Sequence, residues 1–391
     1  MTRVESPRVI RPLAAAFGLM LGPAVALGFA RFAYALVLPS MRADLHWSFA
    51  TAGSINTANA LGYLFGALGA GKLAQRFGER RAFTAGLAIT ALALLASAAT
   101  GQVAVLLTLR LISGVAGAVC FVVGGGLMSQ AGRDCSHARA TLLLGIYFAG
   151  GGVGIVVSGL LVPAALSWGG WRAAWLVLGG LSLLAMLIAV PIARRVPESE
   201  TLPATTAKAP LRPLATLMTC YGFFGAGYIA YMTFIIAVFG ASAGEITAFW
   251  VVLGLSAAVS AFVWNRPLST LRPGAGAAAV LAVLTIGAVL PVLWQGGFFV
   301  SAVLFGGTFL TVASALTSGA RTTLPPDRWT AGIAALTAAF ALGQCVGPVL
   351  AGVLSDGPGG LRLGLTIGAA LLAGGAVVAL VHDRRTAGAR R

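Results

Sequence analysis

Residues 13–38 read LAAAFGLMLGPAVALGFARFAYALVL, an apolar stretch whose only charge is Arg31. At ~1.5 Å per residue, a helix over this stretch is long enough to cross a hydrocarbon core ~30 Å thick. An arginine inside such a helix costs about 2.5–3.5 kcal/mol on insertion scales, and it usually faces a water-filled cavity or the bundle interior. We therefore expect Arg31 to lie on a ligand pathway. The alternative is that Arg31, near the end of the stretch at Leu38, snorkels to the headgroups.

The composition indicates a polytopic α-helical membrane protein. The 391 residues are 58% hydrophobic and 9% charged, the mean hydropathy is +0.93, and apolar runs recur along the whole length. The alternating strands of a transmembrane barrel are absent from the sequence pattern. A net charge of +16 would suggest nucleic acid in a soluble protein, but here the basic residues stand between apolar runs. We therefore expect a lipid bilayer, and no nucleic acid, as partner.

The apolar runs predict twelve transmembrane helices. They cover residues 13–38, 49–71, 82–100, 103–129, 140–165, 171–193, 213–239, 246–264, 274–293, 297–320, 330–354 and 361–381. With a cytoplasmic N-terminus, 21 basic residues fall in inner segments and only 3, Arg42, Arg172 and Arg362, fall in outer segments. This split predicts a protein of the inner membrane with both termini in the cytoplasm.

A polar stretch that cannot span a membrane divides the chain into two halves. Residues 194–212 contain three prolines and two glutamates and predict a cytoplasmic linker. We expect six-helix halves over residues 13–193 and 213–382, and cytoplasmic tails over residues 1–12 and 383–391. The halves resemble each other at an offset of 194 positions, which pairs Gly28, Phe29 and Tyr34 with Gly222, Phe223 and Tyr228. The repeat favours a duplicated, pseudo-symmetric unit.

Signals for other classes of protein are missing. The four cysteines and three histidines share no metal-ligand spacing, so we expect no disulfide, metal site or cofactor. The basic N-terminus leads into an apolar run that is too long for a signal peptide and lacks a small-residue cleavage site, so we expect it to remain as a span. No nucleotide-binding loop or nucleophile–base arrangement is present, which argues against an enzyme or an ATP-driven pump.

Residues 71–81, GKLAQRFGERR, resemble the signature loop of the major facilitator superfamily (MFS). Gly71, Arg76, Gly78 and Arg80 match the family pattern, whereas Gln75 stands in place of the expected acid. In the family, this loop makes charge contacts with neighbouring helix ends that bias the outward-facing state. The resemblance implies that these five residues control conformational exchange, with Gly78 at a sharp turn that needs a positive φ.

Further segments extend the resemblance over the whole chain. Residues 110–117, RLISGVAG, look like the family's fourth-helix arginine–glycine motif, and residues 343–348, GQCVGP, look like a Gly-Pro motif. In the first half, Ile155 stands where antiporters often carry that proline, which weakens a claim of antiport. Residues 28–41 resemble the poorly characterised YbfB/YjiJ-type branch. The resemblance implies an MFS fold and transport by alternating access, and it does not imply a particular substrate.

The membrane-buried polar residues form the candidate substrate site. Arg31 and Arg110 lie at similar expected depths, and the resemblance places both on the wall of the central cavity. Two guanidiniums in a low dielectric repel unless an anion or acceptor lies between them, and a carboxylate or phosphate ester fits their forked donors. The other polar candidates are Tyr34, Asn56, Asn59, Tyr228, Tyr231, Thr308, Thr311 and Gln344. For each alone, interhelical hydrogen bonding worth ~0.6 kcal/mol is an equally good interpretation.

Every acidic residue falls in a loop, a tail or a helix end of the expected topology. No buried carboxylate is therefore available as a proton carrier or as a partner for a cationic drug. We expect a monomeric secondary transporter for a small organic anion. Coupling to protons or to a counter-substrate remains open, as do two alternatives: efflux of amphipathic drugs or metabolites, and a transport-inactive membrane sensor or scaffold.

Overall fold

The computed structural model describes residues 11–198, 211–325 and 328–388, and these segments contain helices and no strands. The expected N-terminal tail and linker therefore lie largely outside the described residues, as do the last three residues of the C-terminal tail. The helices of the first half are α1 (Pro12–Leu19), α2 (Leu21–Pro23), the π-helix η1 (Ala24–Phe32), α3 (Tyr34–Leu45), α4 (Phe49–Phe77), α5 (Glu79–Ser97), α6 (Val103–Ala131) and α7 (His137–Ala193). Those of the second half are α8 (Leu211–Phe239), α9 (Ala243–Thr270), α10 (Pro273–Leu293), the 3-10 helix η2 (Gln295–Gly297), α11 (Phe298–Phe309), α12 (Val312–Thr323), α13 (Trp329–Ser355) and α14 (Gly360–Gly388).

These helices account for the twelve predicted spans. Ten helical segments of the described chain are long and apolar enough to cross a membrane. One of them contains two helices, because α7 is broken by non-helical backbone at Gly169 and Gly170. The 29-residue α4 is also long enough to span, although polar residues such as Asn56 and Asn59 lower its hydropathy.

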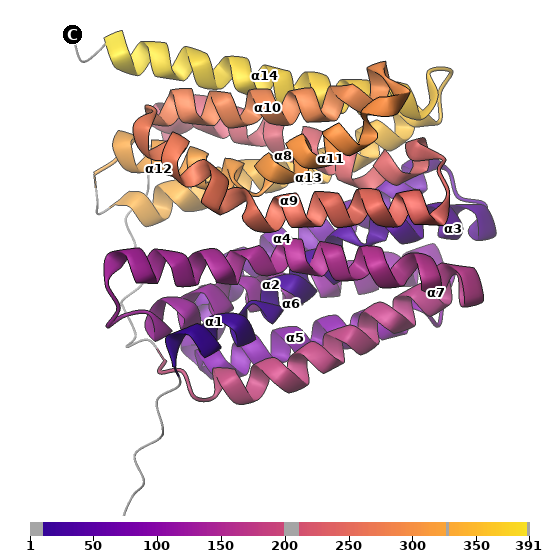
Figure 1. Cartoon of the computed structure of the whole chain (residues 1–391), viewed down its shortest axis with the longest axis horizontal. Coiled ribbons are helices and arrows are strands. Elements are labelled where there is room, and N and C mark those ends of the chain that lie inside the picture. The colour runs from indigo at the N-terminus through magenta and orange to yellow at the C-terminus, as the bar shows by residue number, and fades with distance from the viewer. Residues whose placement is uncertain (1–10, 199–210, 326–327, 389–391) are drawn as a thin grey trace, which may run out of the picture.

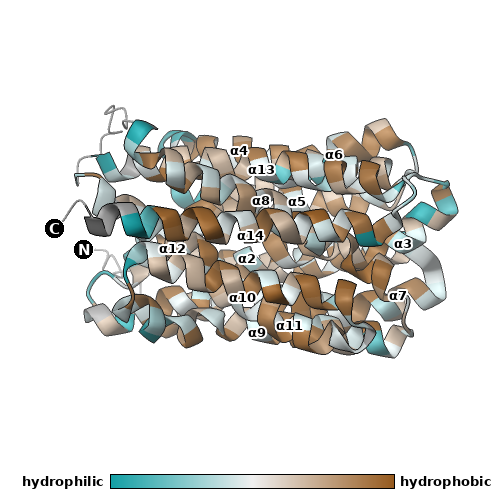
Figure 2. Ribbon diagram, turned by 90° about the horizontal axis from the view of Figure 1, so that it is seen from above, coloured by the Kyte–Doolittle hydropathy of each residue, from teal (hydrophilic) through white to brown (hydrophobic). Residues whose placement is uncertain are grey.

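The helices form two groups that lie side by side (Figure 1). Helices from the first part of the chain, indigo to magenta, pack together, and the orange to yellow helices of the second part pack against them. α1 and the C-terminal end of α14 lie at one end of the molecule, which we call the terminal end. α3 and the kink of α7 lie at the other. We call it the Asp356 end, because Asp356, which follows α13, is hydrogen-bonded there to the start of α4. Hydrophobic residues cover the middle of the helices, and hydrophilic residues concentrate at the two ends (Figure 2).

The first span is longer and less regular than predicted. Its apolar run was expected to end at Leu38, but the helix continues through Pro39 to Leu45. Before that it widens into the π-helix that carries Arg31, where the amide of Ala33 donates to the carbonyl of Gly28 at 2.9 Å. Helix-interior proline and short π-helical stretches are tolerated when neighbouring helices support the backbone, and π-bulges are frequent at functional sites. Arg31 therefore lies deeper in the helix than its distance from Leu38 suggested.

The signature segment is helical instead of forming an extended loop. α4 runs through Gly71, Gln75 and Arg76 to Phe77, and α5 begins at Glu79. The residues before Phe77 are mostly good helix formers, so nothing ends α4 earlier. Only Gly78 breaks the helix, with φ 88° and ψ 147°, which confirms the predicted positive φ. Residues with a Cβ rarely adopt this conformation.

Candidate functional site

A buried network joins Arg31 to the second half of the chain. Arg31 Nη2 donates to Gln344 Oε1 at 2.5 Å, and Gln344 Nε2 donates to the hydroxyl of Tyr228 at 2.5 Å. All three side chains are at most 3% exposed. The Arg31 guanidinium also lies 4.9 Å from the centre of the Tyr63 ring. Arg31 is thus directed into the bundle and not toward headgroups, and its partners come from α4, α8 and α13.

The Arg31 network depends on close packing of η1 against α7. A Cβ at Gly28 would lie 2.4 Å from the Cα of Gly154, so the two backbones approach directly. Glycines that permit such approach are common at helix interfaces in membranes. This contact brings the backbone of η1, the helix that carries Arg31, directly against α7.

Arg110 is a buried cation with aromatic neighbours. It is 1% exposed, and its guanidinium carbon lies 5.4 Å from the ring centres of both Tyr34 and Trp175. Its three guanidinium nitrogens have no hydrogen-bond partner among the described residues. Cation–π attraction of about 2 kcal/mol at a desolvated site offsets only part of the cost of burying a charge. Arg110 therefore has unused donor capacity.

The two arginines contact different partners. Arg31 is held by Gln344 and Tyr63, whereas Arg110 lies against Tyr34 and Trp175. The expectation that both lie inside the bundle agrees with their burial, but no single side chain among the described residues bridges them.

The remaining candidates divide into separate contacts. Asn56 Nδ2 donates to Thr233 Oγ1 at 2.6 Å, which links α4 to α8 across the two halves. Asn59 Nδ2 lies 3.2 Å from both the Arg110 carbonyl and Ser113 Oγ. These two asparagines make the interhelical hydrogen bonds that were the alternative interpretation for each polar candidate.

Three candidates on the second half remain outside the Arg31 network. Tyr231 shares a 2.5 Å hydrogen bond with Ser301, and Thr308 donates to the carbonyl of Leu304 at 2.6 Å. The hydroxyl of Thr311 is buried with no hydrogen-bond partner among the described residues. Of the residues expected to form one site, three belong to the Arg31 network: Arg31, Tyr228 and Gln344.

Two residues of the site, Tyr63 and Trp175, were not predicted from the sequence. Tyr63 contacts Arg31, and Trp175 contacts Arg110. Tyr63 follows Asn56 by two helical turns and so lies on the same face of α4, which is a signal that the sequence contained. Trp175 carried no such signal, because it lies after the kink of α7 and reaches Arg110 only through tertiary packing.

Aromatic side chains of the second half surround Tyr228. We call Tyr221, Phe224, Tyr228, Phe309 and Phe340 the aromatic group. The Tyr228 ring lies 4.7 Å from Phe224, 5.7 Å from Phe340 and 6.2 Å from Phe309, with interplanar angles of 14–17°. The Tyr221 ring lies 4.6 Å from Phe340 at 23°. The aromatic group is therefore a set of nearly parallel rings next to the Arg31 network.

The two halves are tied together at the Asp356 end. Asp356, which follows α13, accepts hydrogen bonds from the backbone amides of Phe49 at 2.7 Å and Ala50 at 2.9 Å. Ser48 Oγ accepts from the amide of Thr51 at 3.0 Å. The first three amides of α4, which no helical partner can satisfy, are thus bonded, two of them by the other half. We call this arrangement the Asp356 contact.

Close backbone packing surrounds the Asp356 contact. A Cβ at Gly53 would lie 2.3 Å from the carbonyl oxygen of Pro348, and one at Gly352 would lie 2.4 Å from that of Phe49. The Phe49 ring lies 3.7 Å from the guanidinium of Arg42 and 6.0 Å from the Phe234 ring. α4 and α13 are therefore in contact at this end, which closes the interface between the halves there.

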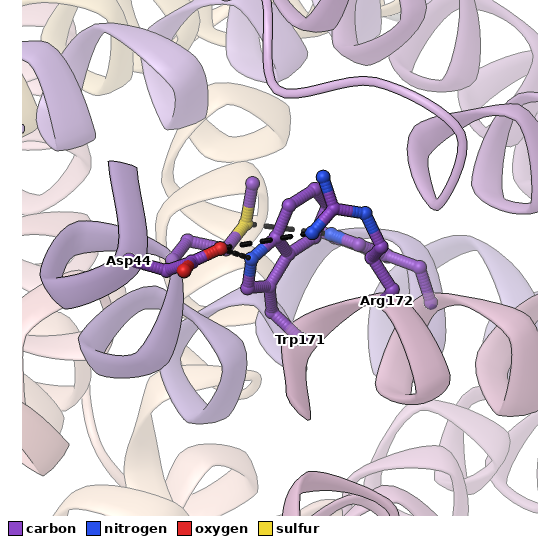
Figure 3. Close-up of polar contacts among 5 residues, drawn as sticks. Asp44, Trp171 and Arg172 are labelled. Carbon is purple, nitrogen blue, oxygen red and sulfur yellow. Dashed lines mark hydrogen bonds and ion pairs between the residues drawn. The ribbon is translucent and has the colours of Figure 1, made fainter. Parts of the chain in front are cut away.

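A second carboxylate at the Asp356 end, that of Asp44, contacts residues of the first half (Figure 3). Asp44 Oδ2 accepts a hydrogen bond from Trp171 Nε1 at 2.7 Å and lies 3.6 Å from Arg172 Nη1. The Arg172 guanidinium stacks 4.1 Å from the Trp171 ring. The ion pair is more than half exposed and so contributes little by itself. Its effect is to join α3 to the residues just after the kink of α7.

At the terminal end, the signature segment contacts the residues that follow α7. The backbone amide of Arg80 donates to Glu198 Oε1 at 2.8 Å, and Arg80 Nε donates to the carbonyl of Val196 at 2.9 Å. The ideal Cβ position at Gly78 lies 3.2 Å from Glu198 Oε1. Arg76 lies 5.4 Å from the ring of its neighbour Phe77. A carboxylate from the start of the expected linker is thus bonded to a segment whose own acid is replaced by Gln75.

Comparison with families of known proteins gives a match over most of the chain. A family described as "Uncharacterised MFS-type transporter YbfB" matches residues 23–380. The 4-hydroxybenzoate transporter PcaK of Pseudomonas aeruginosa is 30% identical over 167 residues, which are 43% of this chain and 36% of PcaK. The tetracenomycin C resistance and export protein of Streptomyces glaucescens is 29% identical over 174 residues, 42% of this chain and 31% of that protein. The matches thus span about a third of the length of these relatives.

Solved transporters share the fold. A mutant of the nucleoside transporter NupG superposes with a TM-score of 0.73 at 12% identity, covering 95% of this chain and 99% of NupG. A bacterial homologue of the human lysosomal transporter Spinster, in an inward-facing and unoccupied conformation, gives a TM-score of 0.72 at 16% identity, covering 96% of this chain and 98% of that one. At these identities, the likeness concerns the fold alone.

Proposed function

This chain belongs to the family of YbfB-type MFS transporters, and we propose that it moves a small organic anion across the inner membrane by alternating access. The chain is an integral membrane protein of a transporter family. We infer a monomer that carries out transport and no catalysis, in which residues 13–193 and 213–382 rock against each other around a central site.

The single observation that carries the anion proposal is the bond between Arg31 and Gln344. The acceptor in this bond is a neutral amide oxygen from the other half. A carboxylate accepts from a guanidinium more strongly than an amide does, and it can bind both arms of the fork. A carboxylate substrate would therefore displace Gln344 from Arg31, while Arg110 and its unused donors supply further positive charge.

The charge distribution supports an orientation for this cycle. Arg42, Arg172 and Arg362 are the basic residues of the segments near the Asp356 end, and many more lie in the segments near the terminal end. By the positive-inside rule, the terminal end is cytoplasmic and the Asp356 contact is external. With α4 and α13 joined at the end proposed to be external, we infer a state closed to the outside.

One relative supports the substrate class and another supports the runner-up. PcaK is named for 4-hydroxybenzoate, a carboxylate at neutral pH. The tetracenomycin C export protein keeps efflux of amphipathic compounds as a second candidate. Coupling to protons or to a counter-substrate is compatible with either, and a transport-inactive scaffold is the third alternative.

A ligand panel followed by counterflow tests the proposal. Thermal unfolding of the full chain in detergent is measured with carboxylates, neutral sugars and cationic drugs, and the stabilising compounds are then assayed for counterflow in proteoliposomes. We expect stabilisation and counterflow only with carboxylates. Stabilisation by cationic drugs alone would favour efflux, and the absence of counterflow with any stabilising ligand would favour a scaffold.

A further inference from the structure

The aromatic rings beside Arg31 lie nearly parallel to one another. Tyr228, Phe224 and Phe340 come from α8 and α13, yet their planes lie within 17° of one another. Aromatic pairs in proteins adopt offset-stacked or edge-to-face arrangements. Here one stacked orientation is repeated between two helices, so a further flat ring can add to the same stack.

One side chain, Gln344, links the aromatic group to Arg31, which carries the charge proposed to bind the anion. Tyr228 belongs to the aromatic group and also accepts a hydrogen bond from Gln344, which in turn accepts from Arg31. The charge comes from the first half and the rings from the second. A ligand with a carboxylate at one end and a flat ring at the other would therefore contact both halves when it displaces Gln344.

Two rings of this region are less buried than the others. Tyr63, beneath Arg31, and Phe340, within the aromatic group, are partly exposed, whereas Phe224 and Tyr228 are buried. These partly exposed rings thus occur one in each half. They are the surfaces on which an incoming ring would stack.

From these observations we infer that the transported anion is an aromatic carboxylate, with its carboxylate on Arg31 and its ring on the aromatic group. This inference rests on the proposed function, because it requires Arg31 to bind the anion. Specificity for a ring over a saturated group of the same size then comes from stacking on Tyr228 and Phe340.

Two probes of equal charge and similar size test the inference. Binding of benzoate and of cyclohexanecarboxylate to the full chain is measured by calorimetry in nanodiscs, with empty nanodiscs to correct for partitioning into lipid. We expect benzoate to bind about two- to tenfold more tightly, the range that one aromatic contact contributes. Equal binding of the two probes would overturn the aromatic inference and leave the anion proposal standing. Binding of neither would overturn both.

A pair of variants locates the ring contact. Phe340→Leu should bring the ratio of the two dissociation constants close to one without weakening cyclohexanecarboxylate. Phe65→Leu, which changes a phenylalanine that is 59% exposed on α4, should leave the ratio unchanged. An unchanged ratio in Phe340→Leu would overturn the placement of the ring. If that variant does not fold, the ratio measured on the unmodified chain still decides the inference.

Discussion

Replacing Asp356 by asparagine should open the Asp356 end of the molecule. The carboxylate bonds two amides at the N-terminus of α4, from the opposite half of the chain. Asparagine keeps one acceptor oxygen of similar shape but loses the second acceptor and the negative charge. Because these bonds exist only when the two halves meet at this end, their loss destabilises this state and not the open one.

The magnitude follows from the two contributions that are lost. A charge near a helix N-terminus contributes typically 0.3–1 kcal/mol at an exposed site, and one hydrogen bond contributes about 0.5–1.5 kcal/mol. Together they amount to about 1–2 kcal/mol, which shifts an equilibrium by a factor of roughly 5–30. The ratio of molecules open at the Asp356 end to molecules closed there should rise by that factor.

Cysteine accessibility measures this shift. Ala52 is fully buried next to the Asp356 contact, where its carbonyl accepts from the Tyr34 hydroxyl at 2.9 Å. In a background without the four native cysteines, Ala52→Cys should react faster with maleimide when Asp356→Asn is added. Glu245→Gln is the matched control, because Glu245 forms a capping box with Ser242 within the second half alone. Equal labelling rates with and without Asp356→Asn, or the same acceleration by Glu245→Gln, would show that Asp356 does not hold this end closed.

Three further predictions concern the turn at Gly78, the Arg31 network and the topology. Gly78→Ala should lower the midpoint of thermal unfolding and slow turnover without weakening substrate binding, because a Cβ at φ 88° costs about 1–3 kcal/mol. Gly71→Ala, within α4, is the control and should change neither quantity. Equal effects of the two substitutions would contradict a role for the turn. Gln344→Leu should tighten binding of benzoate by about tenfold or more, because it removes the acceptor that competes for Arg31 and a hydrogen bond to a charged group contributes about 1.5–3 kcal/mol. Weaker binding would show that Gln344 holds the substrate instead. A cysteine at Ala204 should react with impermeant maleimide only from the cytoplasm and one at Ala43 only from outside, and labelling of position 204 in intact cells would contradict the proposed orientation.

The sequence was sufficient for the helices but not for their ends. Apolar runs follow directly from the need to satisfy every backbone group in lipid, so hydropathy located the spans. Leu38 was a wrong boundary because Pro39 does not stop a helix that its neighbours support. Residues 71–77 were wrongly expected to form a loop, because a family pattern was taken as irregular structure although its residues favour a helix.

The candidate site was predictable in its residue types and not in its connections. Arg31 was identifiable because a charge inside an apolar run is energetically costly and usually has a function. Its bond to Gln344, 313 positions away, depends on how the two halves pack, and no local pattern encodes that packing. The repeat came closest, since it paired Tyr34 with Tyr228, and these two tyrosines lie beside Arg110 and within the Arg31 network respectively.

Binding of benzoate to variants of Arg31 tests directly whether Arg31 receives the anion. Arg31→Ala and Arg31→Lys are compared with Arg362→Ala, a change at the Asp356 end of the molecule and outside the site, by calorimetry on full chains whose folding is checked by thermal unfolding. We expect both Arg31 variants to lose at least tenfold in affinity, because an ammonium cannot reproduce the two-armed contact of a guanidinium, and Arg362→Ala to bind as the unmodified chain does. Benzoate binding that is unchanged in folded Arg31→Ala would contradict the claim that Arg31 receives the anion.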